Sequence, residues 1–299
     1  MAAGQTQGFE QLAAGIYLEG LAVDHSGQAV WYSDVIDGGV HGIATDGSPL
    51  ASFNPDRMWT GGVLMNSDGA VLSSGEGGIM WNDPQTGASG WLVDEIDGAP
   101  VNGINEMVPD GTGGIFFGTS DIEYVIAGKA TRPTALYRLT RDRTLTRLAS
   151  DIGFTNGIMF DPARRRFYCN STFEGTLAFD VTDDLRLTNR TMLLDKEDCD
   201  GLALDCEGNL WVTGFRSGFF ERVAPDGTLL PRVETPAGAI TQLRFGGADG
   251  RDYYFNSVPS DGGDTLKDGG EITSRNSFMY RGHSEIPGLK IGPADFALR

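Results

Sequence analysis

Four residues of this 299-residue chain, Glu19, Asn105, Asn156 and Asp200, carry oxygen-bearing side chains in similar sequence contexts. Each stands five positions before an Asp that opens a turn: Asp24, Asp110, Asp161 and Asp205 respectively. Carboxylate and carboxamide oxygens are the ligands that hard divalent cations prefer. Carboxylates brought close together repel one another unless a positive charge lies between them. If the fold gathers these side chains, the chemistry they predict is that of a metal site.

The four residues belong to a repeat, and the repeat predicts the fold. Six segments starting at residues 19, 61, 105, 156, 200 and 241 share a short apolar run, a turn rich in Asp and Gly, and an alternating strand. Each segment is typical of a β-hairpin, and further strands are expected between the hairpins, for example over residues 134–142 and 175–184. The starts are separated by 41 to 51 residues, which matches four short strands per propeller blade.

The sequence therefore predicts an all-β fold, a six-bladed β-propeller that forms a single domain over residues 1–299. An open β-sandwich is the alternative, but it would not explain six matching starts at nearly constant spacing. Residues 9–17 are a possible short helix. The segment 274–299 is expected to return a strand that closes the ring with the N-terminal segment.

In a propeller, the innermost strand of each blade lines the central channel, so equivalent positions form a ring. The predicted ring contains the four polar residues above, together with Gly61 and Thr241. Its donors are oxygens, with no thiolate or imidazole among them. The expected cofactor is one divalent metal ion, with Ca²⁺ favoured over Mg²⁺, Mn²⁺, Fe²⁺ and Zn²⁺.

Three short motifs on this ring are similar to those of a known family. "LEG" at residues 18–20, "TNG" at 155–157 and "CDGLALDCEGNLWV" at 199–212 resemble the SMP-30/gluconolactonase family of metal-dependent lactonases, also called regucalcin-like. The resemblance covers essentially the whole chain. It implies a six-bladed propeller that opens a small-molecule lactone, with the metal acting as Lewis acid and activating water.

The resemblance also assigns roles to individual residues. It makes Glu19, Asn156 and Asp200 the metal ligands and Asp200 the general base. Asn105, fourteen residues before Thr119 in "FFGT", matches the substrate-binding Asn of the family, and Glu123 matches a substrate-contacting Glu.

The sequence departs from the family pattern at the substrate side. The family's R-x-N-D is replaced by Gly103-Ile104-Asn105-Glu106, so the Arg that grips sugar lactones is missing, and Cys199 replaces a common Pro. Apolar side chains lie near the strand starts and predict a pocket less polar than that of a gluconolactonase: Tyr17, Met58, Trp59, Phe154, Phe173, Phe215, Phe219 and Phe220.

Composition narrows the possible partners. The net charge of −18 argues against a nucleic-acid partner, which requires clustered Lys and Arg. No stretch approaches the roughly 18 apolar residues of a membrane span, so no membrane partner is expected, and the absence of a signal peptide predicts a cytoplasmic protein. Three cysteines without CxxC spacing indicate neither a disulfide framework nor a zinc site.

Two alternative hypotheses stand beside lactone hydrolysis. The same metal site could catalyse another carbonyl reaction, such as hydration, isomerisation or carbon–carbon cleavage. A non-enzymatic propeller that serves as an interaction module is the third hypothesis, although such a module needs no acidic ring on its axis. The pair Asn156-Gly157 could be an ordinary hairpin turn, but it aligns with the strand starts at Glu19 and Asp200, whereas its own hairpin turns later at residues 161–166.

Overall fold

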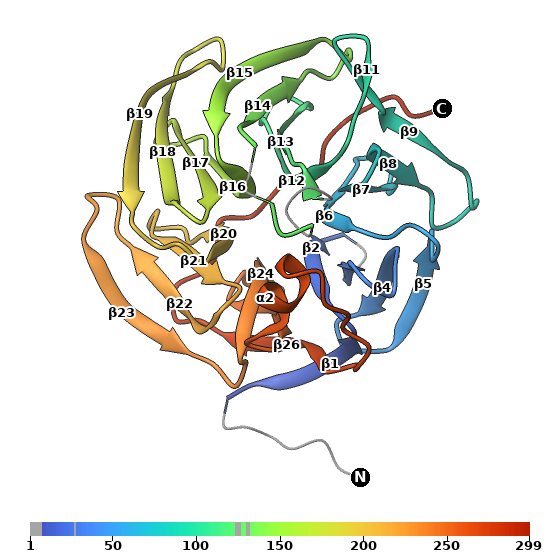
Figure 1. Cartoon of the computed structure of the whole chain (residues 1–299), viewed down its shortest axis with the longest axis vertical. Coiled ribbons are helices and arrows are strands. Elements are labelled where there is room, and N and C mark those ends of the chain that lie inside the picture. Colours follow the sequence, from blue (N-terminus) through green and yellow to red (C-terminus); the bar gives the residue numbers. More distant parts are fainter. Residues whose placement is uncertain (1–7, 27, 123–126, 130–131) are drawn as a thin grey trace.

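The computed structural model describes residues 8–26, 28–122, 127–129 and 132–299. Within these residues the regular secondary structure is almost entirely β-strand, arranged as sheets that radiate from a common centre (Figure 1). This arrangement confirms the predicted all-β propeller.

Four sheets contain four antiparallel strands each, and in each sheet the strands follow chain order from the centre outward (Figure 1). The first consists of β2 (Leu18–Asp24), β3 (Ala29–Asp34), β4 (Val40–Ala44) and β5 (Pro49–Phe53). The second consists of β6 (Thr60–Met65), β7 (Val71–Gly75), β8 (Gly78–Asn82) and β9 (Ser89–Val93). The third consists of β12 (Ile104–Pro109), β13 (Ile115–Thr119), β14 (Thr134–Leu139) and β15 (Leu145–Ile152). The fourth consists of β16 (Phe154–Asp161), β17 (Arg166–Thr172), β18 (Gly175–Val181) and β19 (Leu187–Leu194).

The remaining long strands form one eight-stranded sheet made of two groups of four. One group is β20 (Cys199–Leu204), β21 (Leu210–Gly214), β22 (Ser217–Val223) and β23 (Leu229–Glu234). The other is β24 (Ala239–Gly246), β25 (Asp252–Val258), β26 (Ser277–His283) and β1 (Glu10–Gly15). The groups meet through a single residue pair, Gly214 with Ile240. A small hairpin, β10 (Glu95–Ile96) with β11 (Ala99–Pro100), lies apart from these sheets.

The pairing of β1, near the start of the described residues, with β26 confirms the predicted closure of the ring by segment 274–299. The expected helix over residues 9–17 is wrong, because Glu10–Gly15 forms β1. Backbone pairing of this segment along β26 overrides its weak local helical tendency. The sequence also missed the helix α2 (Gly262–Lys267), which lies over the centre of the ring (Figure 1).

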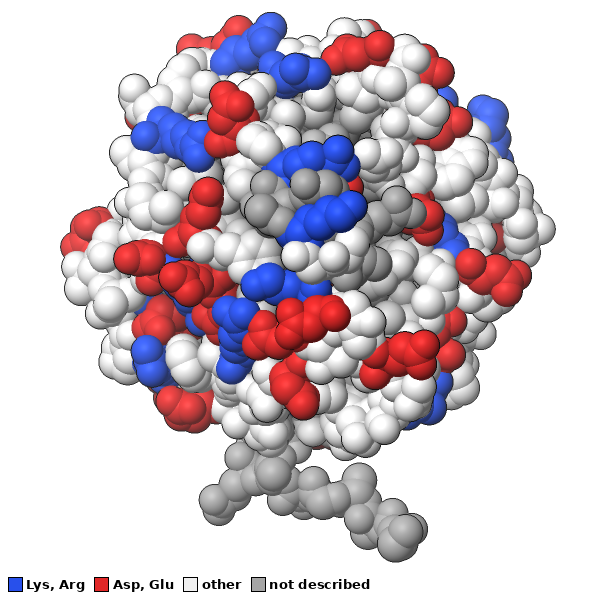
Figure 2. All heavy atoms as spheres, in the orientation of Figure 1, with Lys and Arg blue, Asp and Glu red and all other residues white. Residues whose placement is uncertain are grey.

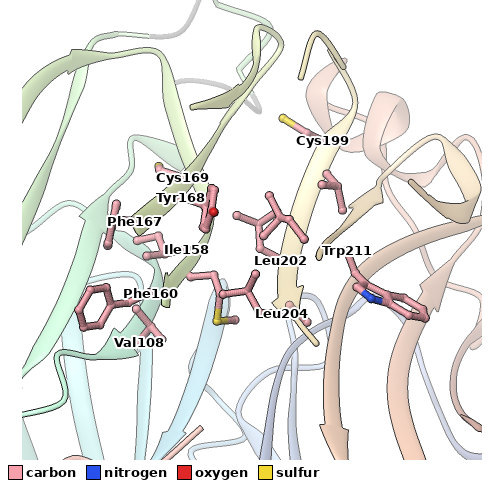
Figure 3. Packing of buried hydrophobic residues seen from close by; sticks show 14 of the residues in the cluster. Val108, Ile158, Phe160, Phe167, Tyr168, Cys169, Cys199, Leu202, Leu204 and Trp211 are labelled. Atoms are coloured by element: carbon pink, nitrogen blue, oxygen red, sulfur yellow. The ribbon is translucent and has the colours of Figure 1, made fainter. Parts of the chain in front are cut away.

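The hydrophobic core fills the spaces between neighbouring sheets, and its largest cluster joins residues of β12, β16, β17, β20 and β21. Figure 3 shows Ile158, Phe167 and Cys169 on one side of this cluster and Leu202 on the other, with Cys199 above Leu202. All five side chains are fully buried. Burial of each large apolar side chain stabilises the fold by about 1.5 to 3 kcal/mol, so this packing fixes how neighbouring inner strands lie.

The Asp residues that open the predicted turns occupy turns in the structure. Asp205 Oδ1 accepts hydrogen bonds from the backbone N–H groups of Glu207 at 3.1 Å and Asn209 at 2.9 Å. Asp110 Oδ1 accepts in the same way from Gly114 at 3.0 Å. These side-chain turns end their inner strands at the same face of the ring, which sets the register that the sequence repeat predicts.

The segment 284–299 crosses the face that carries these turns, and we refer to it as the C-terminal tail. It pairs with Asp205 through Gly288 and with Asn66 through Ala294. Phe296 enters the hydrophobic cluster between the second and third sheets. No helix within the described part of the chain is long and apolar enough to cross a membrane.

Candidate functional site

A cavity of about 110 Å³ opens at the end of the channel opposite the turns. Glu19, Asn105, Asn156 and Asp200 all line it, together with Gly61, so the structure brings together five of the six residues at the predicted register. Thr241, the sixth, is fully buried, and its hydroxyl donates a hydrogen bond to the Leu18 carbonyl at 2.7 Å. Glu123, the expected substrate contact, lies outside the described residues.

Each polar site residue occupies an irregular step of its inner strand. The regular pairing with the second strand breaks between Leu18 and Leu21 around Glu19, between Thr155 and Ile158 around Asn156, and between Cys199 and Leu202 around Asp200. The same break surrounds Asn105, between Ile104 and Met107. A β-bulge releases residues from the ladder and re-aims their side chains, which here turn into the cavity.

Glycines next to the site residues allow the inner strands to approach one another around the axis. A Cβ on Gly157 would lie 2.3 Å from the carbonyl oxygen of Asp200, and a Cβ on Gly20 would lie 2.1 Å from that of Gly61. No side chain fits at these distances. Asn156-Gly157 is therefore not a hairpin turn: it forms the bulge of β16, at the point where β16 packs against β20.

Two carboxamides on second strands hold the bulges of the two acidic residues. Asn170 Nδ2 donates to the Asp200 carbonyl at 2.6 Å. Asn256 Nδ2 donates to the carbonyls of Glu19 at 2.9 Å and Gly20 at 3.2 Å. The sequence analysis missed both residues, although they occupy matching places in the related stretches "FYCNST" and "YYFNSV".

The two carboxylates are in an environment that disfavours negative charge. Asp200 is only 3% exposed, and its Oδ1 has no hydrogen-bond partner among the described residues. Burial raises the pKa of Asp200 well above its usual value, the charge of Glu19 raises it further, and the Asn156 carboxamide opposes the shift. Burial and the charge of Glu106 raise the pKa of Glu19 to about 8.

These features fit a bound cation. A divalent ion would give the unpartnered Asp200 Oδ1 a ligand and would offset the repulsion between Asp200 and Glu19. No group of three or more His, Cys, Asp or Glu side chains suited to a metal gathers anywhere in the described ranges. Such a cation would therefore depend on the carboxamide oxygen of Asn156 in addition to the two carboxylates, which is a donor set for hard ions.

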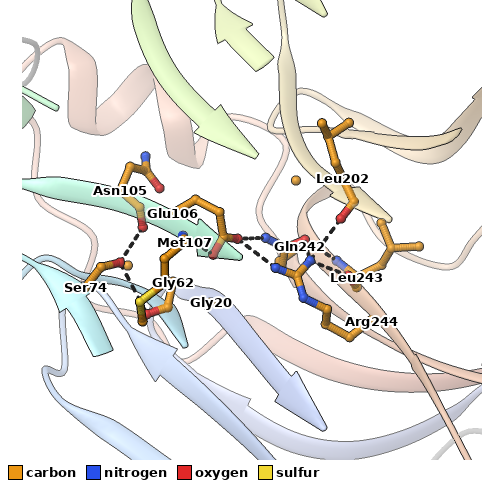
Figure 4. Close-up of polar contacts among 12 residues, drawn as sticks. Gly20, Gly62, Ser74, Asn105, Glu106, Met107, Leu202, Gln242, Leu243 and Arg244 are labelled. Atoms are coloured by element: carbon orange, nitrogen blue, oxygen red, sulfur yellow. Dashed lines mark hydrogen bonds and ion pairs between the residues drawn. The ribbon is translucent and has the colours of Figure 1, made fainter. Parts of the chain in front are cut away.

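A buried ion pair between β12 and β24 supports the floor of the cavity. Arg244 Nη2 lies 3.0 Å from Glu106 Oε2, and Arg244 Nη1 donates to Gln242 Oε1 at 2.6 Å (Figure 4). Glu106 also accepts a hydrogen bond from the side chain of Gln242. No role was predicted for Arg244 or Gln242, because nothing in the repeat marks β24 as a partner of Glu106.

The cavity walls are mostly apolar. Five of the eight apolar residues expected at the mouth line the cavity: Tyr17, Trp59, Phe154, Phe173 and Phe215. The expectation is wrong for Met58, Phe219 and Phe220, which are not among the lining residues. Phe220 is fully buried in the largest core cluster, and Met58 is 38% exposed at the surface. The ring of Phe219 lies between the cations of Lys196 and Arg232, whose charged groups are 5.2 and 4.0 Å from its centroid.

Comparison with known proteins identifies the family. Residues 18–258 match the model of the SMP-30/gluconolactonase/LRE-like region. The chain belongs to this family. The matched residues include every inner strand from β2 to β24, and therefore all four polar residues that line the cavity.

Individual family members are similar at modest identity. Over 221 residues the chain is 27% identical to pentonolactonase XacC of Haloferax volcanii. This alignment covers 71% of this chain and 72% of that protein. It is 28% identical to regucalcin of Gallus gallus, over 82% of this chain and 80% of the relative. A solved structure of regucalcin from Agrobacterium tumefaciens, described as a calcium-binding protein, superposes with a TM-score of 0.78 at 19% identity and covers 97% of both chains. This structural likeness shows the shared propeller fold.

Proposed function

We propose that this protein hydrolyses a small-molecule lactone with the help of one divalent metal ion, which Glu19, Asn156 and Asp200 would hold. The single observation that carries the proposal is the unpartnered, buried Asp200 Oδ1 in a cavity that it shares with Glu19, Asn156 and Asn105. The lactonase name of the Haloferax relative supports the reaction, and the regucalcin likeness favours Ca²⁺.

Each residue has a role in this reaction. When bound, the metal ion supplies Lewis acidity toward the ester carbonyl and lowers the pKa of a bound water. Asp200 acts as general base and accepts the proton of the attacking water on a carboxylate oxygen. Asn105 orients the lactone through its carboxamide, and Glu123 recognises a polar substituent. The apolar walls exclude bulk water and favour a substrate less polar than a sugar lactone.

The test is lactone hydrolysis before and after exhaustive chelation, with metal content measured on the untreated protein. We expect chelation to abolish turnover, and one added divalent ion per chain to restore it. Asp200→Asn should remove activity while far-UV circular dichroism stays unchanged. Hydrolysis that survives complete metal removal would show that the proposal is wrong.

The same donor set could serve another carbonyl reaction, and the absence of the family's Arg at Gly103 motivates that alternative. A panel that includes enolisable ketones, assayed with added Ca²⁺ or Mn²⁺, separates the two reactions. We also propose that the chain is one six-bladed domain, with the eight-stranded sheet counted as two blades joined at Gly214 and Ile240.

A further inference from the structure

We infer that the substrate carries one anionic group on a mainly apolar body, and that Lys267 of α2 binds this group. The inference rests on the proposed lactone hydrolysis and specifies the class of lactone. No role was assigned to Lys267 in the reaction, and the residue lies on a helix that the repeat does not predict.

The apolar part of the inference comes from one continuous aromatic wall of the cavity, formed by Phe154, Phe173 and Phe215. The ring centroids of Phe154 and Phe173 are 6.3 Å apart, and those of Phe173 and Phe215 are 5.9 Å apart in an edge-to-face arrangement. All three rings line the cavity. Such a wall offers no hydrogen-bond partners for sugar hydroxyls, so it fits a hydrocarbon portion of the substrate.

The anionic part comes from the charge of Lys267. Of the residues that line the cavity in the described ranges, Lys267 is the one cation, and its Nζ lies 5.0 Å from the centroid of the Phe173 ring. A cation so placed at the aromatic wall can bind an anion while the wall contacts the apolar body. It also offsets the repulsion that Glu19 and Asp200 would exert on an anionic ligand in the same cavity.

The charge of Lys267 is available to a ligand because the nearby acid of α2 is already paired. Asp264, one turn earlier on the helix, accepts hydrogen bonds from Arg216 Nε at 2.9 Å to Oδ2 and 3.1 Å to Oδ1. Asp264 forms its ion pair with Arg216, and the charge of Lys267 acts on Asp264 as a smaller contribution that lowers the pKa of this carboxyl. The Arg216–Asp264 pair therefore anchors α2 and leaves the lysine for the cavity.

Packing holds α2 against the aromatic wall. A Cβ on Gly263 would lie 2.4 Å from the Phe215 ring, so helix and ring are in direct contact. The guanidinium of Arg216 lies 4.7 Å from the centroid of the same ring. Figure 2 shows basic side chains near the middle of the face that carries α2, with acidic side chains beside them.

The experiment compares two γ-butyrolactones that differ in charge alone, one with a γ-carboxylate and one with a γ-carboxamide. For Lys267→Met we expect KM for the carboxylate lactone to rise about tenfold with kcat little changed, because one charge-assisted contact is lost. KM for the carboxamide lactone should change by less than about twofold, and Lys267→Arg should keep most of the preference because it retains the charge.

Lys290→Met is the matched control, since Lys290 lies among residues of the turn face, away from the cavity. It should leave both KM values unchanged. Equal KM changes on the two lactones in Lys267→Met, or no change on either, would overturn the inference.

A binding measurement keeps this test separate from the test of the reaction. Calorimetry on the metal-loaded protein compares cyclopentanecarboxylate with cyclopentanecarboxamide. If the wild type binds the carboxylate more tightly and Lys267→Met loses this preference, the inference is supported. If neither lactone is hydrolysed in that case, only the proposed reaction fails. Equal carboxylate affinity in the wild type and in Lys267→Met contradicts the inference whatever the enzyme activity.

Discussion

The Glu106 carboxylate and the Arg244 guanidinium lie 3.0 Å apart across the channel, although the two residues are 138 positions apart in the chain. Their side chains are 2% and 5% exposed. The pair links β12 to β24, two inner strands of different sheets, directly beneath residues that line the cavity. It also places a negative charge near Glu19, whose pKa it helps to raise.

Glu106→Gln should therefore destabilise the fold strongly. The substitution leaves the buried guanidinium of Arg244 without a counter-charge, and loss of one partner of a buried pair costs about 3 to 5 kcal/mol. Urea unfolding measures the loss. Asp97→Asn is the control, because Asp97 pairs with Arg147 at 71% exposure and an exposed pair contributes at most about 1 kcal/mol. Equal effects of the two substitutions would contradict the structural role of the channel pair.

Asp200→Asn should have the opposite effect on stability in the metal-free protein. The change removes a buried carboxylate whose Oδ1 has no partner. At pH 8 the free energy of unfolding of the chelated variant should therefore be about 2 kcal/mol higher than that of the chelated wild type. Adding Ca²⁺ or Mn²⁺ should raise the melting temperature of the wild type and not that of the variant. Asp183→Asn, at a fully exposed carboxylate, should change neither quantity.

Gly157→Ala tests the close approach of β16 and β20. The new methyl group would lie 2.3 Å from the Asp200 carbonyl oxygen and 2.8 Å from backbone atoms of Gly201. Because these are backbone atoms, one of the two strands must move. Overpacking of this kind costs about 1 to 3 kcal/mol, and the shift should weaken metal affinity measured by calorimetry. Gly292→Ala is the control, because a Cβ there has no atom within 4 Å. Unaltered metal binding in Gly157→Ala would show that the contact is not needed for the site.

The three cysteines should differ sharply in reactivity. Cys206 is exposed, whereas Cys169 and Cys199 are buried in the core. Burial raises the pKa of the Cys169 thiol to about 12, and burial with the charge of Asp200 raises that of Cys199. At pH 8 both buried thiols stay protonated and unreactive. Titration with a thiol reagent should find one reactive group in the native protein and all three in denaturant; rapid modification of a second thiol in the native protein would contradict this packing.

The sequence was informative about the site where the repeat carried the information. The spacing of Glu19, Asn105, Asn156 and Asp200 predicted that they meet, because a turn-opening Asp fixes the register of each of the four inner strands that carry them. Contacts outside the repeat were not predictable in this way. Arg244 meets Glu106 only because the ring brings distant strands together, and Lys267 lies on a six-residue helix whose glycine-rich start has the composition of a turn. Glu123 remains a prediction.

Phe296 tests the contribution of the C-terminal tail. Its ring is buried in the cluster that contains Leu64 and Trp81. Its backbone N–H donates to Asn66 Oδ1 at 2.9 Å. Phe296→Ala should lower the free energy of unfolding by about 3 to 5 kcal/mol, measured by urea denaturation. Leu229→Ala, at a side chain that is 58% exposed, should have little effect. A small loss in Phe296→Ala would mean that the tail contributes little to the ring.

The tail has a consequence for biosynthesis. Phe296 and Ala294 bind beside β6, yet both follow all of the propeller strands in chain order. While the ribosome is still making β26, the second sheet stands with an uncovered apolar seam, and β1 has no strand to pair with. The nascent chain therefore stays incompletely packed, with apolar surface exposed, until residues 284–299 have been synthesised.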